Sequence, residues 1–143
     1  MKKIYVCDGI VWKGKISPAQ VIKEQNEANI LVHTEAFDLK SKKSTRLSVS
    51  TKIFEYLNAG KIVLGYGPMD VASMEFLDEV GVSVLCGEKE NLLESIKSII
   101  KNYDELSVIA TEGTEYAKEH FDKRTVSKRF LNIVLNVWKN ERK

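Results

Sequence analysis

Short apolar runs of β-branched and leucine residues alternate along this chain with segments that carry helix signals. The runs are Ile4–Cys7, Ile30–His33, Ile62–Tyr66 and Val82–Cys86. Continuous apolar strands joined by helices are typical of a parallel sheet covered on both faces. The alternation therefore predicts an α/β fold, with a Rossmann-like parallel sheet of about four strands, flanking helices and a helical C-terminal tail.

Capping residues mark where the helices begin and end. Ser17-Pro18-Ala19-Gln20 has the form of a capping box with proline at the first helical position, which predicts a helix ending near Ala28. Gly81 is expected to end a later helix. The other predicted N-caps are Asp70, Asp104 and Asp122. Thr34 to Val49 is expected to be a long irregular segment, which is solvated or functional.

The last predicted helix carries an apolar stripe at helical spacing. Its residues are Val126, Phe130, Ile133, Val134 and Val137. A stripe of this kind is most simply explained as part of the hydrophobic core.

Composition limits the class of protein. A length of 143 residues predicts one domain, residues 1–143. A formal net charge of +2 is too small to argue for nucleic acid or an anionic membrane as a partner, and no run is long enough to span a bilayer. Cys7 and Cys86 are each expected to be buried and reduced, which favours a cytoplasmic protein without a zinc site.

The segment Ser50–Gly60, followed directly by a strand, predicts a helix with a polar start and a glycine stop. The first turn of a helix presents free N–H groups and the positive end of the dipole, which together favour an anion such as phosphate. Lys52 would add a positive charge to such a site. An ordinary capped helix, with Ser50 or Thr51 as N-cap and Glu55 in the first turns, explains the same residues.

The order of residues around Glu55 is similar to a known family. Glu55 is followed by Tyr-Leu-Asn-Ala-Gly-Lys and an apolar strand. This pattern resembles the C-terminal domain of GT-B glycosyltransferases, especially the retaining family 4, in which a Ser/Thr-Lys pair like Thr51-Lys52 often opens the same helix. Ile4 to Gly9, Glu27 to Val32 and Glu115 to Asp122 resemble further parts of that domain. In the family the final helix often crosses back to the partner domain, which would leave part of the apolar stripe without cover in this chain.

The resemblance implies roles for particular residues. Glu55 would hold the ribose, and Gly9 and Ile10 would lie beside the nucleobase. The diphosphate would be bound by Ser50, Thr51, Lys52 and Arg46, the last from the basic loop before the helix. The first glutamate of the family's paired motif should stand eight positions before Glu55, where this chain has Leu47. Glu35 would fill that place if Phe37 to Val49 is an insertion, so Lys52 and Glu35 are the candidate catalytic residues.

The function implied by the resemblance is transfer of a sugar from a nucleotide-diphosphate sugar to an acceptor, with retention, as in surface polysaccharide synthesis. No metal or other cofactor is expected, because the helix dipole and the cations would neutralise the diphosphate. The chain resembles the later part of a donor-binding domain, so its partner would be a missing N-terminal acceptor-binding domain, and the chain alone is expected to be inactive. Any peripheral contact with a membrane would be made through that absent half.

Two other functions are compatible with the same pattern. The chain could be a non-enzymatic flavodoxin-like binding or regulatory module, or a fragment whose helices complete a partner chain in an assembly. A receiver domain is disfavoured, because Asp8 has no acidic neighbours.

Overall fold

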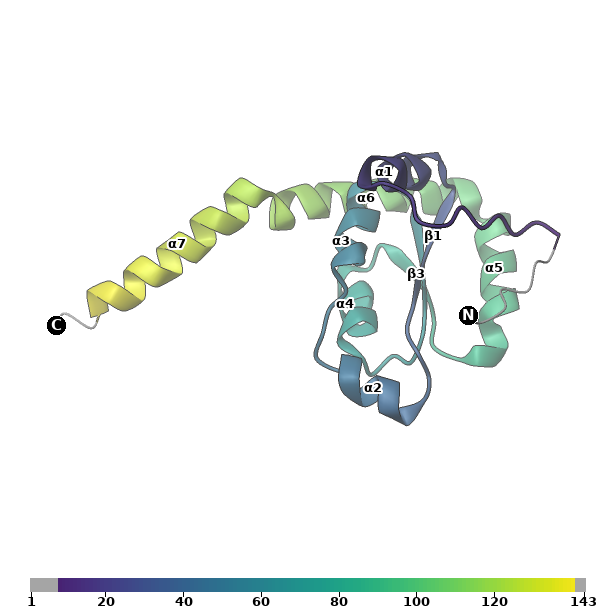
Figure 1. Cartoon of the computed structure of the whole chain (residues 1–143), viewed down its shortest axis with the longest axis horizontal. Coiled ribbons are helices and arrows are strands. Elements are labelled where there is room, and N and C mark those ends of the chain that lie inside the picture. The colour runs from purple at the N-terminus through teal and green to yellow at the C-terminus, as the bar shows by residue number, and fades with distance from the viewer. Residues whose placement is uncertain (1–7, 141–143) are drawn as a thin grey trace.

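The structure, a computed structural model, describes residues 8–140. The described elements are α1 (Pro18–Glu27), β1 (Ile30–Thr34), α2 (Leu39–Thr45), α3 (Thr51–Asn58), β2 (Ile62–Tyr66), α4 (Ala72–Val80), β3 (Ser83–Cys86), the short 3-10 helix η1 (Lys89–Asn91), α5 (Leu92–Lys101), α6 (Tyr103–Phe121) and α7 (Lys123–Asn140). The α/β prediction is confirmed by a small parallel sheet flanked by helices, which fits a Rossmann-like fold (Figure 1).

Within the described residues the sheet has three strands in the order β1-β2-β3. Leu31 pairs with Val63, His33 pairs with Gly65, and Leu64 pairs with Val84. All pairs are parallel. The prediction of about four strands included Ile4–Cys7, which lies outside the described residues.

Two apolar clusters cover the two faces of the sheet. On one face Val63 packs with residues of α3, α4 and the later part of α6, including Leu57 and Met74. On the other face Ile62 and Leu64 pack with Ile99 of α5 and with the earlier part of α6. Because successive side chains of a strand point to opposite faces, a strand buried on both sides must be apolar throughout, as β2 is.

Local capping chemistry explains several of the helix boundaries. The Ser17 hydroxyl accepts from the Gln20 amide at 3.3 Å and the Gln20 side chain accepts from the Ser17 amide at 2.9 Å, so the predicted capping box is present. Gly81 ends α4 with a left-handed φ of 72°. The Asp122 carboxylate accepts from the amides of Arg124 and Thr125 at the start of α7.

Three boundary predictions were wrong. The segment Thr34 to Val49 is not irregular throughout, because Asp38 caps the seven-residue helix α2 by accepting from the Ser41 amide at 3.0 Å. Asp70 does not cap α4, which begins one residue after Val71. Asp104 does not cap α6 either, because that helix already begins at Tyr103 after Asn102.

The last helix differs from the simpler expectation, in which its apolar stripe belongs to the core. In Figure 1, α7 extends away from the rest of the molecule, beyond the end of α6. Every side chain from Val126 to Lys139 is exposed. The apolar stripe is therefore not part of this chain's core, because the helix has no layer of the described residues to pack against.

Candidate functional site

The beginning of α3 is held in place by a buried serine of α4. The Ser50 amide donates to the Ser73 hydroxyl at 3.1 Å, and that hydroxyl donates to the Ser48 carbonyl at 3.2 Å. Ser73 is fully buried. Among the residues that the structure describes, none caps α3 through a side chain, and the Ser50 side chain makes no cap hydrogen bond. The start of α3 is thus positioned by tertiary contacts.

A buried polar pair lies at the carboxyl end of β1. The His33 Nε2 is 3.0 Å from the Glu35 Oε1, and the two side chains are 6% and 10% exposed. The Glu35 amide continues the sheet by donating to the Tyr66 carbonyl at 2.9 Å. Since buried polar atoms need partners, this contact orients both side chains.

The start of α3 and the His33–Glu35 pair face the same cavity of about 310 Å³. Its lining residues are Val32, His33, Thr34, Glu35, Thr45, Ser48, Ser50, Lys52 and Tyr56. Hydroxyl groups predominate in this lining, together with one ammonium and one carboxylate. The volume is at the small end of the range for ligand pockets, which is about 300 to 1,000 Å³. The cavity is therefore large enough for a small polar ligand.

Tyr56 contributes a hydroxyl group that keeps its proton. Burial, and secondarily the neighbouring Glu55 carboxylate, raise the pKa of Tyr56 above its ordinary value. The hydroxyl is therefore a hydrogen-bond donor at neutral pH, which suits an anionic ligand.

Three of the predicted site residues meet in this cavity. Ser50 and Lys52, both at the start of α3, line it together with Glu35, which follows β1. Thr51 is exposed at the first position of α3 and does not line the cavity.

Arg46, predicted to bind the diphosphate, is directed elsewhere. Its guanidinium Nη1 donates to the Asp70 carbonyl, and its own carbonyl accepts from the Ala72 amide. Both contacts connect the end of α2 to the start of α4. Arg46 therefore holds the loop before α3 against the start of α4. It does not line the cavity.

Glu55, predicted to hold the ribose, lines other cavities. Its Oε2 accepts from the Gln25 Nε2 at 3.3 Å, and it lines a hollow of about 640 Å³ between α1 and α3. Gly9 and Ile10, the predicted nucleobase-side residues, are exposed in the segment before α1, and Gly9 has a left-handed φ of 95°. The structure does not bring these three residues into the cavity that Lys52 lines.

Gly65 within β2 and Gly67 directly after it have a packing role. A Cβ on Gly67 would lie 2.6 Å from the Glu35 Cβ, and a Cβ on Gly65 would lie 2.8 Å from the Leu85 Cδ2. Because glycine has no Cβ, the side chain of Leu85 can pack against Gly65, and Glu35 can pack against Gly67.

Sequence reasoning missed part of the lining. No ligand-binding role was predicted for His33, Thr45, Ser48 or Tyr56, which all line the cavity. Tyr56 stands four residues after Lys52 on the same side of α3, a spacing that could have indicated it. No local sequence pattern indicated Thr45 or Ser48, because these two residues reach the cavity only when the segment from Thr34 to Val49 folds.

The remaining predictions concern membranes, metals and thiols. In residues 8–140, no helix combines the length and apolar composition needed to cross a bilayer. Within the same residues no group of three or more His, Cys, Asp or Glu side chains is arranged to hold a metal ion. Cys86 is a buried free thiol, as predicted, whereas Cys7 lies outside the described residues.

Comparison of this chain with models of protein families, with curated proteins and with solved structures found no match.

Proposed function

We propose that the cavity at the start of α3 binds the diphosphate of a nucleotide-diphosphate sugar, and that this chain is the donor-binding part of a GT-B-type retaining glycosyltransferase. The observation that carries the proposal is the meeting of Ser50, Lys52 and Glu35 in one polar cavity. Ser50 and Lys52 belong to the start of α3, whereas Glu35 follows β1, so two separate segments supply the lining.

The position of the cavity supports the proposal. Thr34 and Glu35 are at the carboxyl end of a parallel strand, and ligands of open α/β sheets bind outside this end. The start of α3 faces the same space. Two independent features, the strand end and the helix start, therefore favour the same place for an anionic ligand.

The charges define what the cavity could do in sugar transfer. The Lys52 ammonium and the positive end of the α3 dipole would stabilise negative charge that develops on the departing diphosphate. Tyr56 and the serine hydroxyls would donate to its oxygens. Glu35 accepts from His33 through one oxygen, which leaves the other oxygen to accept a hydroxyl of the sugar.

The proposal gives Arg46 and Glu55 smaller parts than the sequence suggested. Arg46 would position the loop from which Ser48 and Ser50 extend, because its guanidinium is engaged at Asp70. Glu55 would reach a ribose only if the nucleoside lies between α1 and α3, where the larger hollow is. A donor spanning both cavities would place its diphosphate at Lys52 and its ribose at Glu55.

A ligand titration followed by amide NMR tests the proposal directly, because binding does not require the acceptor-binding part. UDP, GDP and ADP are each compared with the corresponding nucleoside and with inorganic diphosphate. We expect the diphosphates to shift the amides of Ser50 to Glu55 and of His33 to Glu35, and the nucleosides to leave these amides nearly unchanged. Shifts absent from both segments with all three nucleotides, in a folded sample, would contradict the proposal.

A further inference from the structure

The C-terminal helix α7 is more positively charged than the chain as a whole. The chain has a formal net charge of only +2. Residues 123–140 contain no aspartate or glutamate, and their basic residues are Lys123, Arg124, Lys128, Arg129 and Lys139. This helix therefore carries a local charge of the kind that attracts anionic surfaces.

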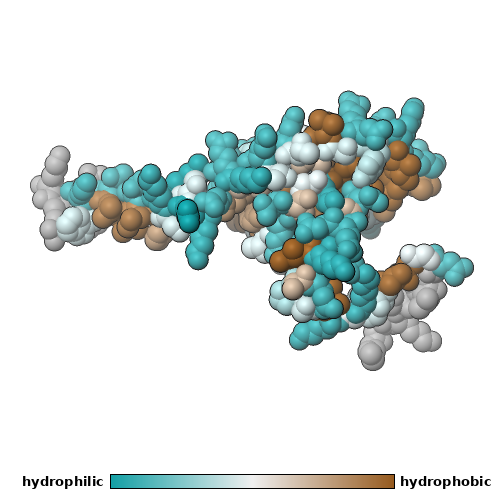
Figure 2. Space-filling view, turned by 90° about the horizontal axis from the view of Figure 1, so that it is seen from above, coloured by the Kyte–Doolittle hydropathy of each residue, from teal (hydrophilic) through white to brown (hydrophobic). Residues whose placement is uncertain are grey.

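The same helix exposes large apolar side chains. Phe130 is 68% exposed and Ile133 is 62% exposed, although both are strongly hydrophobic. The other exposed apolar residues of α7 are Val126, Leu131, Val134, Leu135, Val137 and Trp138. Figure 2 shows brown hydrophobic side chains along the projecting helix, bordered by teal polar ones. An apolar face of this size marks a contact surface.

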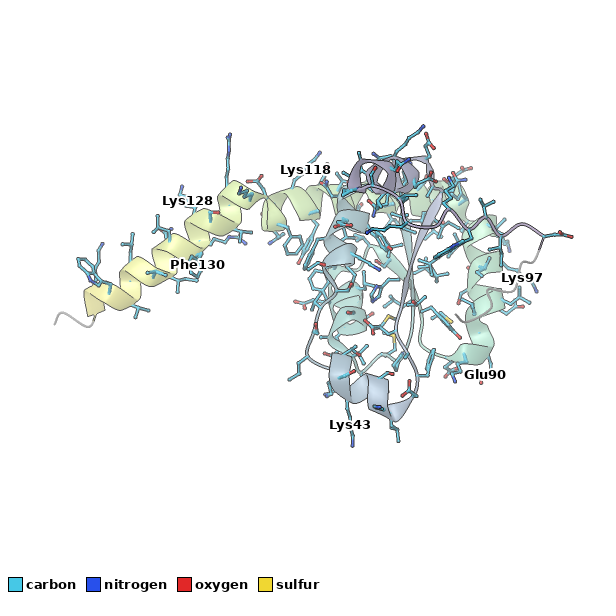
Figure 3. The ribbon with its side chains drawn as sticks, in the orientation of Figure 1. Lys43, Glu90, Lys97, Lys118, Lys128 and Phe130 are labelled. Atoms are coloured by element: carbon cyan, nitrogen blue, oxygen red, sulfur yellow. The ribbon has the colours of Figure 1, made fainter. Side chains whose placement is uncertain are left out.

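The apolar side chains cover more than half of the helix circumference. At 3.6 residues per turn, the apolar residues from Phe130 to Trp138 extend over an arc of roughly 200°. Lys128 and Lys139 lie on the opposite side, and Figure 3 places Lys128 and Phe130 on opposite sides of α7. The seam of a two-helix contact is narrower than this, because it uses only two positions in seven. A flat apolar environment covers such a wide arc better than a single partner helix.

The charge also argues against a second copy of this chain as the partner. Pairing α7 with another α7 would bring together the five basic residues of each copy, with no acidic residue between positions 123 and 140 to compensate. An anionic lipid surface offers the opposite charge at its headgroups and apolar chains beneath them. Helices that lie in such interfaces combine basic polar faces with Trp, Phe and Leu on the other face.

From these observations we infer that α7 is an interfacial helix that lies in the plane of an anionic membrane surface. Its apolar side inserts below the headgroups, and its basic residues contact the lipid phosphates. The α/β body is held at the membrane by this helix, which does not cross the bilayer. In this inference the membrane contact is made by α7 itself.

The test is sedimentation of the full chain with lipid vesicles. One set of vesicles is pure phosphatidylcholine, and the other contains roughly a third phosphatidylglycerol to supply negative charge. We expect binding to the anionic vesicles only, and weaker binding as the salt concentration rises. Failure to bind the anionic vesicles at low salt would overturn the inference.

Variants separate α7 from the rest of the protein. Lys128→Glu/Arg129→Glu should weaken binding by roughly 25-fold or more, because each cation near an anionic surface contributes about fivefold. Phe130→Asp/Ile133→Asp should abolish insertion. The matched control Lys40→Glu/Lys43→Glu makes the same change of net charge on α2, and Figure 3 shows Lys43 far from α7. This control should retain most of the binding.

Two outcomes would contradict the role of α7. If the α2 control loses as much binding as Lys128→Glu/Arg129→Glu, net charge and not α7 is responsible. If the chain forms dimers without vesicles and Phe130→Asp/Ile133→Asp dissociates them, the apolar face is covered by a second copy. Sedimentation velocity measures the second outcome. Because these side chains are exposed, the variants should keep the circular dichroism spectrum of the original chain.

Discussion

The His33 Nε2 lies 3.0 Å from the Glu35 Oε1, and both side chains are almost completely buried at the end of β1. Residues two apart on a strand point to the same side, so the spacing allows the two side chains to meet where the strand ends. A carboxylate at this depth is costly unless it is hydrogen-bonded. The contact with His33 therefore fixes the position of the Glu35 side chain in the cavity wall.

Removing one member of this pair should destabilise the fold. Glu35→Ala leaves a His33 nitrogen buried without its acceptor, and an unsatisfied buried polar group costs about 1–3 kcal/mol. We expect the loss in the free energy of unfolding to be in this range, measured by urea denaturation. Glu112→Ala, at an exposed position of α6, is the control and should change the stability by less than about 0.5 kcal/mol.

The coupling within the pair is measured by adding His33→Ala and the double variant. The double-mutant cycle should give an interaction energy of about 0.5–3 kcal/mol, because contacting residues are not additive. Additive losses would show that the two side chains do not interact.

Gly67→Ala should displace Glu35. The new Cβ would lie 2.6 Å from the Glu35 Cβ and 3.2 Å from backbone atoms of Glu35, which cannot move without shifting the end of β1. We expect a loss of about 1–3 kcal/mol in the free energy of unfolding, typical of overpacking. Amide NMR should show shifts at Glu35 and at neighbouring cavity residues.

Gly87→Ala is the matched control for this prediction. Its Cβ would meet the side chain of Met69 at 2.7 Å, and this side chain is 39% exposed and flexible. The loss should therefore be smaller than for Gly67→Ala. Equal losses would indicate that the close approach of Gly67 to Glu35 is unimportant.

Lys52→Ala should weaken the binding of a diphosphate much more than the binding of a nucleoside. The ammonium would contribute a charge-assisted hydrogen bond to phosphate oxygens, and the nucleoside has none. We expect at least a tenfold weaker affinity for UDP, GDP or ADP, whichever binds, with loss of one charged contact of about 1.5–3 kcal/mol. Isothermal titration calorimetry measures both affinities.

Lys43→Ala removes a charge of the same kind from α2, outside the cavity lining, and should leave both affinities unchanged. An equal loss of diphosphate and nucleoside binding in Lys52→Ala would contradict the phosphate contact. The same conclusion would follow if Lys43→Ala were as harmful as Lys52→Ala.

The ion pair between Lys42 and Asp70 should give a pH-dependent link between α2 and α4. The Lys42 Nζ is 2.7 Å from the Asp70 Oδ2, and this contact lowers the pKa of Asp70 below its ordinary value. Because the folded-state pKa is the lower one, the stabilisation is fully present above the unfolded-state pKa. It is lost as the pH falls through the folded-state pKa.

Side-chain carboxyl NMR of Asp70 between neutral and acidic pH checks this expectation. In Lys42→Met the pKa of Asp70 should rise toward its ordinary value, while the pKa of Asp38 should stay lowered. The pKa of Asp38 is lowered chiefly by the hydrogen bond from the Ser41 amide, which this variant does not touch. An unchanged pKa of Asp70 in Lys42→Met would show that the ion pair is not formed in solution.

Features with local causes were predictable from the sequence. The capping box at Ser17, the glycine stop at Gly81 and the cap at Asp122 each depend on residues within one turn of the helix end. The apolar run Ile62–Tyr66 was also recognised as a buried strand, because only a strand covered on both faces is apolar throughout. The start of α3 at Ser50–Thr51 was also predicted, but its cause is not local, because the Ser50 side chain makes no cap hydrogen bond and the Ser50 amide donates to Ser73 of α4.

Contacts between distant segments could not be predicted in this way. Asp70 was expected to cap α4, but its carboxylate pairs with Lys42 of α2, and the Arg46 guanidinium donates to the Asp70 carbonyl. The spacing of residues along the chain does not predict these contacts of Asp70, because they form only when the segment after β1 packs against the start of α4. Contacts between distant segments also orient the side chains of Arg46, which donates to the Asp70 carbonyl, and of Glu55, which accepts from Gln25.

By itself, the sequence determined the α/β class and several helix ends, because these depend on periodicity and on short-range hydrogen bonds, which adjacent residues specify. The choice of Ser50 and Lys52 rested on the helix start together with the family resemblance, and the choice of Glu35 rested on that resemblance alone. Only the tertiary structure decided that those three residues share one cavity with His33, and that the apolar face of α7 is exposed. The physical reason is that periodicity shows which face of an element is apolar, whereas packing against other elements decides whether that face is covered.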